Sequence, residues 1–188
     1  HLNDLLIYNR IRVFVAPYTK LRKDCVQLQS CVRCIMNIGF YFIKSDFFRL
    51  VNSGLEWMDS TTNKHMYFVL PLKNELWAIP LSSQYNKYKN WYNEAKQLNK
   101  KNRFLIFVNV MNRDGVLLIQ NAFPITKTFI DREAFDKHNN HLTLSSNLIQ
   151  FVEKRLKLMN TYEEKGILNF HANLNLIRNI LHKNSGNL

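Results

Sequence analysis

Hydroxyl, aromatic and lysine side chains follow one another in the stretch from Ile79 to Lys89, IPLSSQYNKYK. Its apolar beginning predicts a buried strand, and Ser82 and Ser83 come directly after that strand. Serine hydroxyls donate hydrogen bonds, lysines such as Lys87 supply positive charge, and tyrosines such as Tyr85 present ring faces on which a base can stack. The stretch is therefore typical of a site that holds a phosphate group.

The same residue types also have ordinary structural roles. Ser82 and Ser83 could form a turn or cap the following helix, and capping is compatible with anion binding because helix N-termini attract negative charge. Aromatic residues recur at helical spacing in the next segment, which usually marks the face of a helix that packs inward. These residues are Tyr85, Tyr88, Trp91 and Tyr92, together with Ala95. We expect this stripe to join the core and Lys87, Lys89 and Lys96 to lie elsewhere on the helix.

The chain is strongly basic, since 26 Lys and Arg residues against 14 Asp and Glu residues give 188 residues a net charge of +12. Such a charge favours nucleic acid or an anionic membrane surface as a partner. No apolar run approaches the roughly 20 residues that cross a bilayer, and the beginning lacks a signal-peptide pattern. We therefore expect a cytoplasmic protein. The basic cluster at Lys100, Lys101 and Arg103 suits the C-terminus of a helix, and equally contact with phosphate.

The three cysteines lie near the beginning of the sequence, at Cys25, Cys31 and Cys34. Cys31-x-x-Cys34 could be half of a zinc site or a redox pair, but no second pair follows at the needed spacing. We therefore expect reduced thiols, no metal and no cofactor. The sequence contains no P-loop, glycine-rich dinucleotide turn, H-E-x-x-H motif or nucleophile elbow, and its acids are too scattered for a metal-dependent nuclease.

The apolar pattern predicts one α+β domain over residues 36–188, with antiparallel hairpins packed by helices. We expect Met36 to be the natural start, with residues 1–35 as upstream sequence or a dispensable extension. Strands are predicted at 37–43, 66–72, 75–81, 104–110 and 116–120, and helices at 45–54, 84–98, 145–164 and 174–181. The hairpin 104–120, joined through Asn112–Gly115, is predicted to form the centre of the sheet. Pro71 and Pro80 predict edge or terminal positions because proline lacks an N–H donor.

Two motifs occur in order along the chain. The first is Gly39-Phe40-Tyr41-x-Ile43, followed by Ile79-Pro80-Leu81-Ser82-Ser83 and Lys87-Tyr88, and the second is LIQNAFPIT at 118–126. With these motifs, residues 39–181 resemble toxins of type III toxin–antitoxin systems, the ToxN/AbiQ superfamily, and most closely its CptN-like branch. The resemblance implies a fold like that of the Kid and MazF toxins, a compact twisted antiparallel sheet packed by helices.

The activity that the resemblance implies is that of a metal-independent endoribonuclease. Toxins of this kind are inhibited by an antitoxin RNA of short pseudoknots, which the toxin cuts from a tandem-repeat precursor. The resemblance also implies closed assemblies of alternating toxin and RNA. Released toxin would cleave cellular or phage RNA and limit phage spread by abortive infection.

Roles for single residues follow from the same resemblance. Ser82 and Ser83 match the family's PL(S/T)S segment and would hydrogen-bond the scissile phosphate. Lys87 matches a family lysine, which would stabilise developing charge or act as a general acid, and Tyr67 corresponds to an aromatic residue that positions the nucleotide. His65 is a further candidate because histidine has the pKa for proton transfer, although a single histidine before a strand is more often a surface residue. The candidate RNA-binding residues are Lys64, Tyr85, Lys89, Lys100, Lys101, Arg103 and Lys127.

The reaction needs only alignment and charge stabilisation by the protein. RNA cleaves itself when its 2′-hydroxyl is deprotonated and held in line with the adjacent phosphorus, which leaves a 2′,3′-cyclic phosphate and a 5′-hydroxyl. The sequence is also compatible with two other classes of protein. A basic RNA-binding module without catalysis would have the same charge and aromatic residues, and a membrane-surface adaptor would use helix 84–98 as an amphipathic face.

Overall fold

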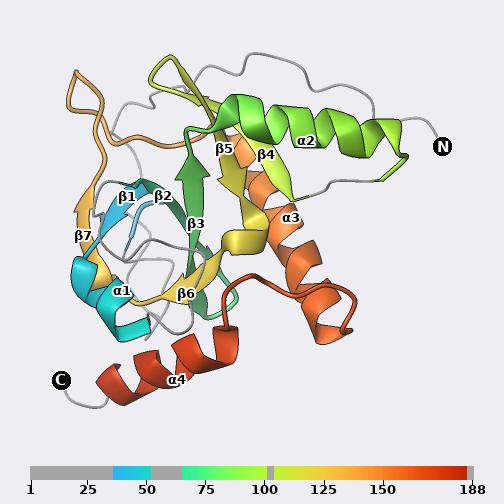
Figure 1. The fold of residues 1–188 in the computed structure, drawn as a ribbon. Helices are drawn as coiled ribbons and strands as arrows, with labels where there is room; N and C mark the ends of the chain where they lie inside the picture. The colour runs from blue at the N-terminus through green and yellow to red at the C-terminus, as the bar shows by residue number, and fades with distance from the viewer. Residues whose placement is uncertain (1–35, 52–64, 101–103, 186–188) are drawn as a thin grey trace.

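The computed structural model describes residues 36–51, 65–100 and 104–185 (Figure 1). The predicted extension at 1–35, with its three cysteines, lies outside the described residues, as do Lys64, Lys101 and Arg103. The described ranges contain every strand and every helix that the sequence predicts, except the last three residues of the first predicted helix, 52–54.

An antiparallel sheet of seven strands forms the body of the described chain, in the order β4-β5-β3-β2-β1-β7, with β6 also paired to β3. The strands are β1 (Gly39–Ile43), β2 (Tyr67–Leu72), β3 (Glu75–Ser82), β4 (Leu105–Val110), β5 (Arg113–Leu118), β6 (Phe123–Ile125) and β7 (Ile130–Glu133). The predicted hairpin of β2 and β3 is confirmed, and it lies at the middle of the sheet. Tyr67 pairs with Pro80, and Leu72 pairs with Glu75 beside a turn in which Lys73 has a φ of 55°.

Pro80 lies where β3 changes its partner strand. Leu76 to Ala78 pair with β6, whereas Leu81 and Ser82 pair with β5. On the other side of β3, the N–H of Leu81 donates to the carbonyl of Met66. Because successive N–H groups of a strand point to opposite sides, an N–H at residue 80 would point toward β5 and β6, and neither of these strands pairs with residue 80. Proline has no N–H, so it leaves no unsatisfied donor there. Pro80 fits a central strand for this reason, near the end of that strand as predicted but not at the sheet's edge.

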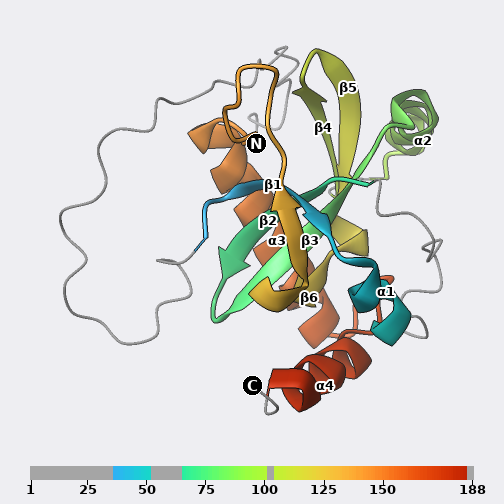
Figure 2. The same cartoon turned by 90° about the vertical axis from the view of Figure 1, so that its left-hand side faces the viewer.

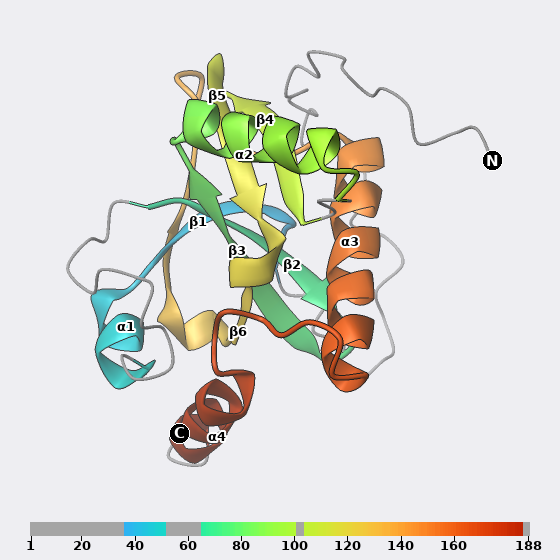
Figure 3. The ribbon, with the colours of Figure 1, turned by 45° about the vertical axis from the view of Figure 1, so that its right-hand side comes forward.

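Within the described ranges, four helices surround the sheet (Figures 1 and 3). They are α1 (Ser45–Val51), α2 (Tyr85–Gln97), α3 (Ser146–Glu164) and α4 (Leu174–Ser185), and the 3-10 turns η3 (Ile119–Asn121) and η4 (Lys127–Phe129) flank β6. The predicted helix at 145–164 is confirmed as α3, which buries Val152, Leu156 and Met159, and Gly166 with a φ of 63° follows its end. Among the described residues, no helix is both long and apolar enough to cross a membrane.

The helices α2 and α4 lie at opposite ends of the molecule. Helix α4 contacts β6, whereas α2 contacts β4 and β5. Figure 2 shows α2 beside the β4–β5 hairpin and apart from α3 and α4. Since β3 runs between these ends, the β2–β3 turn is near α4 and the last residues of β3 lead into α2 (Figure 1).

Aromatic side chains fill the core between the sheet and α1. Phe47 of α1 stacks on Phe123 of β6 with ring centroids 5.2 Å apart, and Phe48 meets Tyr67 of β2 at 5.9 Å. All four side chains are at most 5% exposed. Burial of each large apolar side chain contributes roughly 1.5–3 kcal/mol. The structure thus confirms the predicted α+β class, an antiparallel sheet packed by helices.

The prediction that the β4–β5 hairpin forms the centre of the sheet is wrong, because β4 is an edge strand. Its turn is also shorter than predicted. The two turn residues are Met111 and Asn112, with φ of 54° and 61°, and Asp114 and Gly115 already pair with β4. Positive φ at both central residues is the geometry that suits the twist of a two-residue hairpin, and here Met111 and Asn112 adopt it without a glycine.

Candidate active site

The two predicted serines lie where β3 leads into α2. Ser82 is the last residue of β3 and pairs with Val116 of β5. Its hydroxyl accepts a hydrogen bond from the backbone N–H of Gln84 at 3.2 Å, which forms a small turn between strand and helix. Ser83 is exposed, and its hydroxyl makes no hydrogen bond to another described residue. A rigid strand therefore holds one half-buried and one solvent-facing hydroxyl at its end.

Gly115 lets β5 approach β3 beside these serines. A Cβ atom at this position would lie 3.0 Å from Cδ1 of Leu81 and 3.3 Å from the carbonyl oxygen of Ser82. Both distances are shorter than ordinary carbon contacts, so a side chain would press against the end of β3. The glycine that the sequence assigned to a turn is in fact required for the packing that supports Ser82.

The N-terminus of α2 adjoins Ser83. The N–H of Tyr85 donates to the carbonyl of Ser83 at 2.8 Å, and Gln84 at the N-cap forms no side-chain cap. The first turn of the helix contains no acidic residue. Backbone N–H groups at the positive end of the helix dipole can therefore receive an anion.

Lys87 adds a full positive charge to this helix end. It lies in the first turn of α2, is exposed, and forms no ion pair with a described acid. Its Nζ lies 4.9 Å from the ring centroid of Trp91, one helical turn further along. Serine hydroxyls, helix N–H groups and a lysine ammonium thus occur together, and this combination can bind a phosphate and stabilise additional negative charge on it.

His65 lies on the neighbouring strand approach. Tyr67 pairs with Pro80 and the carbonyl of Met66 accepts from Leu81, so continuing this register by one residue puts His65 opposite Ser82. The side chain of His65 is exposed. The structure therefore brings the backbone of the predicted proton-transfer residue next to the serine pair, whereas the role of the imidazole stays a prediction.

Tyr67, which was predicted to position the nucleotide, is buried, so its ring is not available for stacking on a base. It is 2% exposed, and its ring packs against Phe48 and Phe123 in the core. Burial raises the pKa of its hydroxyl well above the ordinary value, so the group stays neutral at physiological pH. A direct role in positioning RNA would have to come from this hydroxyl, since the ring faces are occupied.

The aromatic stripe of α2 differs from its prediction, because the helix has no fully buried residue. Tyr85 and Tyr92 meet Phe107 of β4 edge-on at 5.3 and 5.6 Å, and Lys89 Nζ lies 5.1 Å from the same ring. Trp91 instead remains 50% exposed. Helical spacing indicated the shared stripe, but α2 packs against the narrow edge of the sheet, and that edge covers only part of the stripe.

The remaining described RNA-binding candidates are distant from the serines. Lys100 follows the C-terminus of α2, about 20 Å from its N-terminus at about 1.5 Å per residue. Lys127 begins η4, next to β6, and Ile125 of β6 pairs with Leu76 of β3. Leu76 is six residues before Ser82, or about 20 Å along the strand. These lysines could contact only an RNA that extends well beyond the serine pair.

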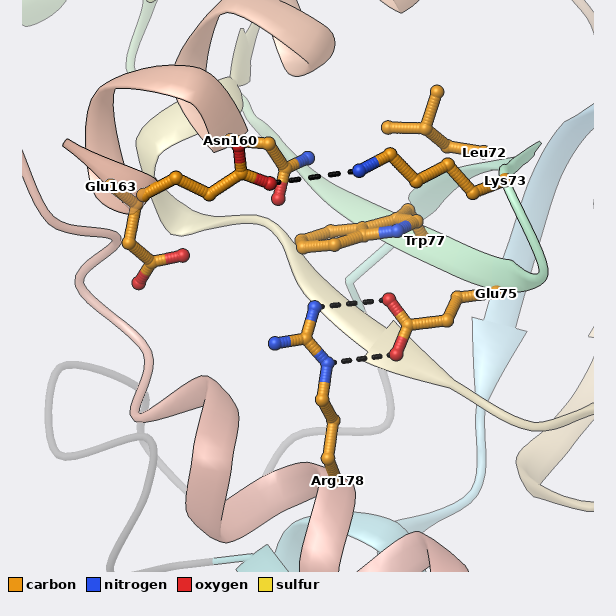
Figure 4. Close-up of a pocket in the computed structure, with 8 residues that line it drawn as sticks. Leu72, Lys73, Glu75, Trp77, Asn160, Glu163 and Arg178 are labelled. Carbon is orange, nitrogen blue, oxygen red and sulfur yellow. Dashed lines mark hydrogen bonds and ion pairs between the residues drawn. The ribbon is translucent and has the colours of Figure 1, made fainter.

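A small pocket of about 100 Å³ lies at the other end of β3, and no sequence motif indicated it (Figure 4). Arg178 of α4 donates two hydrogen bonds to the carboxylate of Glu75, at 2.8 and 3.0 Å, close to the ring of Trp77. Glu163 also lines the pocket, and burial raises the pKa of its carboxyl above the ordinary value. The Arg178–Glu75 pair joins α4 to the β2–β3 hairpin, which is a structural role. Within the described residues, no group of three His, Cys, Asp or Glu side chains is arranged to hold a metal ion.

Comparison with known proteins gives matches at the level of the fold. No family model matches this sequence, and no curated protein matches it. The structure is similar to that of AbiQ, a lactococcal anti-phage endoribonuclease of a type III toxin–antitoxin system, with a TM-score of 0.61 and 16% identity over 80% of this chain and 99% of that one. It is also similar to a structure from bacterial type III toxin–antitoxin systems in which a non-coding RNA pseudoknot selectively inhibits the toxin, with a TM-score of 0.55, 12% identity and the same coverage. The chain thus shares the fold of these toxins along nearly their whole length.

Proposed function

We propose that this protein is an endoribonuclease toxin of a type III toxin–antitoxin system. The observation that carries the proposal is the position of Ser82, Ser83 and Lys87 at the exposed N-terminus of α2. Support also comes from the fold shared with AbiQ and from the family motifs that contain these three residues. Phosphate-binding groups at the end of a rigid strand are suited to holding one RNA linkage for cleavage.

The proposed reaction is transfer of the phosphoryl group within the RNA. The 2′-oxygen attacks the adjacent phosphorus as its proton leaves to a base, the bond to the 5′-oxygen breaks, and that oxygen receives a proton. The products are a 2′,3′-cyclic phosphate and a 5′-hydroxyl. Ser82, Ser83 and the α2 N–H groups bind the phosphate oxygens, and Lys87 stabilises the charge that grows on them. His65, opposite Ser82 in the continued register, is the candidate for proton transfer.

The proposal extends to the biological system. We assign the chain to the CptN-like branch on its two motifs, and residues 36–188 to the toxin domain. Its partner would be an antitoxin RNA of pseudoknot repeats, bound in closed toxin–RNA assemblies, and its target would be cellular or phage RNA in the cytoplasm. The inhibition of a structurally similar toxin by an RNA pseudoknot and the anti-phage activity of AbiQ support this part of the proposal.

The test is cleavage of RNA in the presence of EDTA. We expect purified protein to produce fragments that end in a 2′,3′-cyclic phosphate, identified by mass spectrometry. Ser83→Ala and Lys87→Ala should each lower the cleavage rate by at least about 100-fold, as expected for loss of a group that stabilises transition-state charge. A single 2′-deoxy nucleotide at the cleaved position should block the reaction, because it lacks the nucleophile.

Two control variants separate the proposed site from general effects on charge and folding. Ser146→Ala removes an exposed serine at the start of α3, and Lys154→Ala removes an exposed lysine of the same helix, away from α2. Both should cleave at nearly the rate of the unsubstituted protein. Binding of RNA without any cleavage would instead identify a non-catalytic RNA-binding module. Cleavage that Ser83→Ala and Lys87→Ala leave unchanged would place the active site elsewhere.

A further inference from the structure

Trp91 is a large apolar side chain on the surface of a helix that has no fully buried residue. It is 50% exposed, although tryptophan is usually well covered in folded proteins. The aromatic neighbours Tyr85 and Tyr92 do have a packing role, because both meet Phe107. Trp91 is not needed for that contact, so its exposure calls for another explanation.

The surroundings of Trp91 hold its ring in place and leave it accessible. Tyr88 meets the indole edge-on, with centroids 5.3 Å apart and an interplanar angle of 85°. Lys87 lies four residues earlier on the same face of the helix, with its Nζ 4.9 Å from the indole centroid. The edge-on neighbour orients the indole, the Lys87 ammonium lies over the ring, and half of the side chain stays exposed, so an accessible aromatic surface remains next to a cation.

The position of Trp91 relates this surface to the proposed cleavage site. Lys87 belongs to both, because it lies in the first turn of α2 next to Ser83 and also contacts the indole. Trp91 is about 12 Å from Ser83 along the helix, at about 1.5 Å per residue. A strand whose phosphate lies at the serines can therefore place a nearby base over Trp91.

The chemistry of this face fits single-stranded RNA. Residues 85–100 contain four lysines and a single glutamate, so a polyanion is attracted along the helix. Unpaired bases stack on aromatic side chains, whereas the bases of a duplex already stack on one another. Insertion into a membrane is disfavoured, because Tyr85 and Tyr92 are turned toward β4 and few apolar side chains remain on the open face.

We propose that Trp91, oriented by Tyr88 and paired with Lys87, is a stacking site for an unpaired base of single-stranded RNA next to the cleaved linkage. This inference rests on the proposed function for its location at the active site. By holding one base, Trp91 would fix the register of the RNA strand and thereby determine which linkage reaches Ser82 and Ser83.

The first experiment measures binding of a 2′-O-methyl RNA oligonucleotide, which cannot be cleaved, by the full chain. Loss of one base–aromatic stack should weaken binding by Trp91→Ala roughly 5- to 150-fold. Trp91→Phe keeps an aromatic face on which a base can stack and should bind within about threefold of the unsubstituted protein. Ile167→Ala removes another exposed apolar side chain, 62% exposed in the loop before α4, and should change nothing.

Fluorescence and abasic nucleotides test the contact itself. The chain contains three tryptophans, of which Trp77 is buried, so RNA should quench the emission of Trp91 and this quenching should disappear in Trp91→Phe although binding persists. One abasic position in the oligonucleotide should weaken binding to the unsubstituted protein and have no further effect on Trp91→Ala, since both changes remove the same stack.

Equal affinity of the unsubstituted protein and Trp91→Ala, or equal effects of every abasic position on both proteins, would overturn the stacking site. The result is separable from the nuclease proposal. Ser83-dependent cleavage with normal binding by Trp91→Ala retains the nuclease and rejects the stacking site. Weak binding by Trp91→Ala in a protein that cleaves no RNA retains the stacking site and rejects the nuclease.

Discussion

Gly39 and Gly166 occupy positions that favour glycine for different physical reasons. A Cβ atom on Gly39 would lie 2.3 Å from Cε1 of His141 and 2.5 Å from the carbonyl oxygen of Leu142. The backbone at Leu142 is fixed there, because the N–H of Phe40 donates to the same carbonyl at 2.9 Å. Gly166 has open space around it, and only its φ of 63° favours glycine. One glycine therefore permits close packing of β1, and the other ends a helix.

Gly39→Ala should consequently destabilise the protein much more than Gly166→Ala. We expect Gly39→Ala to cost at least about 2 kcal/mol, because the overlap involves backbone that cannot move without breaking a hydrogen bond. Gly166→Ala should cost about 1 kcal/mol, the usual penalty for a left-handed alanine. Urea denaturation of both variants measures the difference. Equal costs would show that the segment at 141–142 shifts freely away from β1.

Single residues could be predicted from the sequence where neighbours in the chain are also neighbours in space. Ser82, Ser83 and Lys87 lie within one strand–helix junction, so the local pattern was enough to group them. His65 could be placed near Ser82 because the β2–β3 turn was recognisable. The burial of Tyr67 depends on Phe48 and Phe123, from α1 and β6, and the local pattern does not encode that contact.

At the scale of elements, α2 depends on one ring of the sheet. Phe107 of β4 meets Tyr85 and Tyr92 of the helix edge-on, and Lys89 also lies over it. None of the helix's own residues is fully buried. The position of the helix and the stability of the sheet are thus largely separate, since Phe107 lies on the face of β4 opposite the core residues Ile106 and Val108.

Phe107→Ala should therefore reduce RNA cleavage by more than its effect on stability predicts. We expect the cleavage rate to fall at least tenfold, because α2 carries Lys87 and no longer has a fixed position relative to Ser82. Amide hydrogen exchange should become faster in α2 while the amides of β2 and β3 remain protected. Phe151→Ala is the matched control, since Phe151 is also partly buried and pairs with a cation, Arg155, but belongs to α3. Unchanged cleavage in Phe107→Ala would contradict this role.

The elements themselves were mostly predictable, and their arrangement was less so. Helices α2, α3 and α4 and the β2–β3 hairpin follow from apolar periodicity and turn residues, which act locally. Strand β4 lies at the edge because it is joined to the sheet only through β5. Strand β5 in turn pairs only with Leu81 and Ser82 of β3, because β6 pairs with the adjoining part of that strand. This division depends on contacts between strands distant in sequence, and Pro80 is its only local sign.

At the scale of the whole molecule, the two ends of β3 differ in character. The β2–β3 turn and α4 are joined by the Arg178–Glu75 pair, and Lys73 of the turn lies 3.6 Å from Glu164, so these two cations are matched by acids. Around α2, Lys87 and Lys96 are exposed, and no ion pair joins them to a described acid. These two cations are therefore available to an anionic partner along α2, whose N-terminus adjoins Ser82 and Ser83.

Salt dependence can measure how far RNA extends from this end toward Lys127. The logarithm of the binding constant should fall linearly with the logarithm of salt concentration, with a slope near −0.7 for each phosphate contacted by a single strand. Lys87→Ala should make the slope less steep by about 0.7 for both a short and a long 2′-O-methyl RNA. Lys127→Ala should do so only for the long RNA, because Lys127 is about 20 Å from the serines. Lys157 is ion-paired with Glu153 at 2.7 Å, so Lys157→Ala should change neither slope. If Lys127→Ala also leaves both slopes unchanged, the prediction that Lys127 binds RNA is wrong and the bound strand is confined to the α2 end.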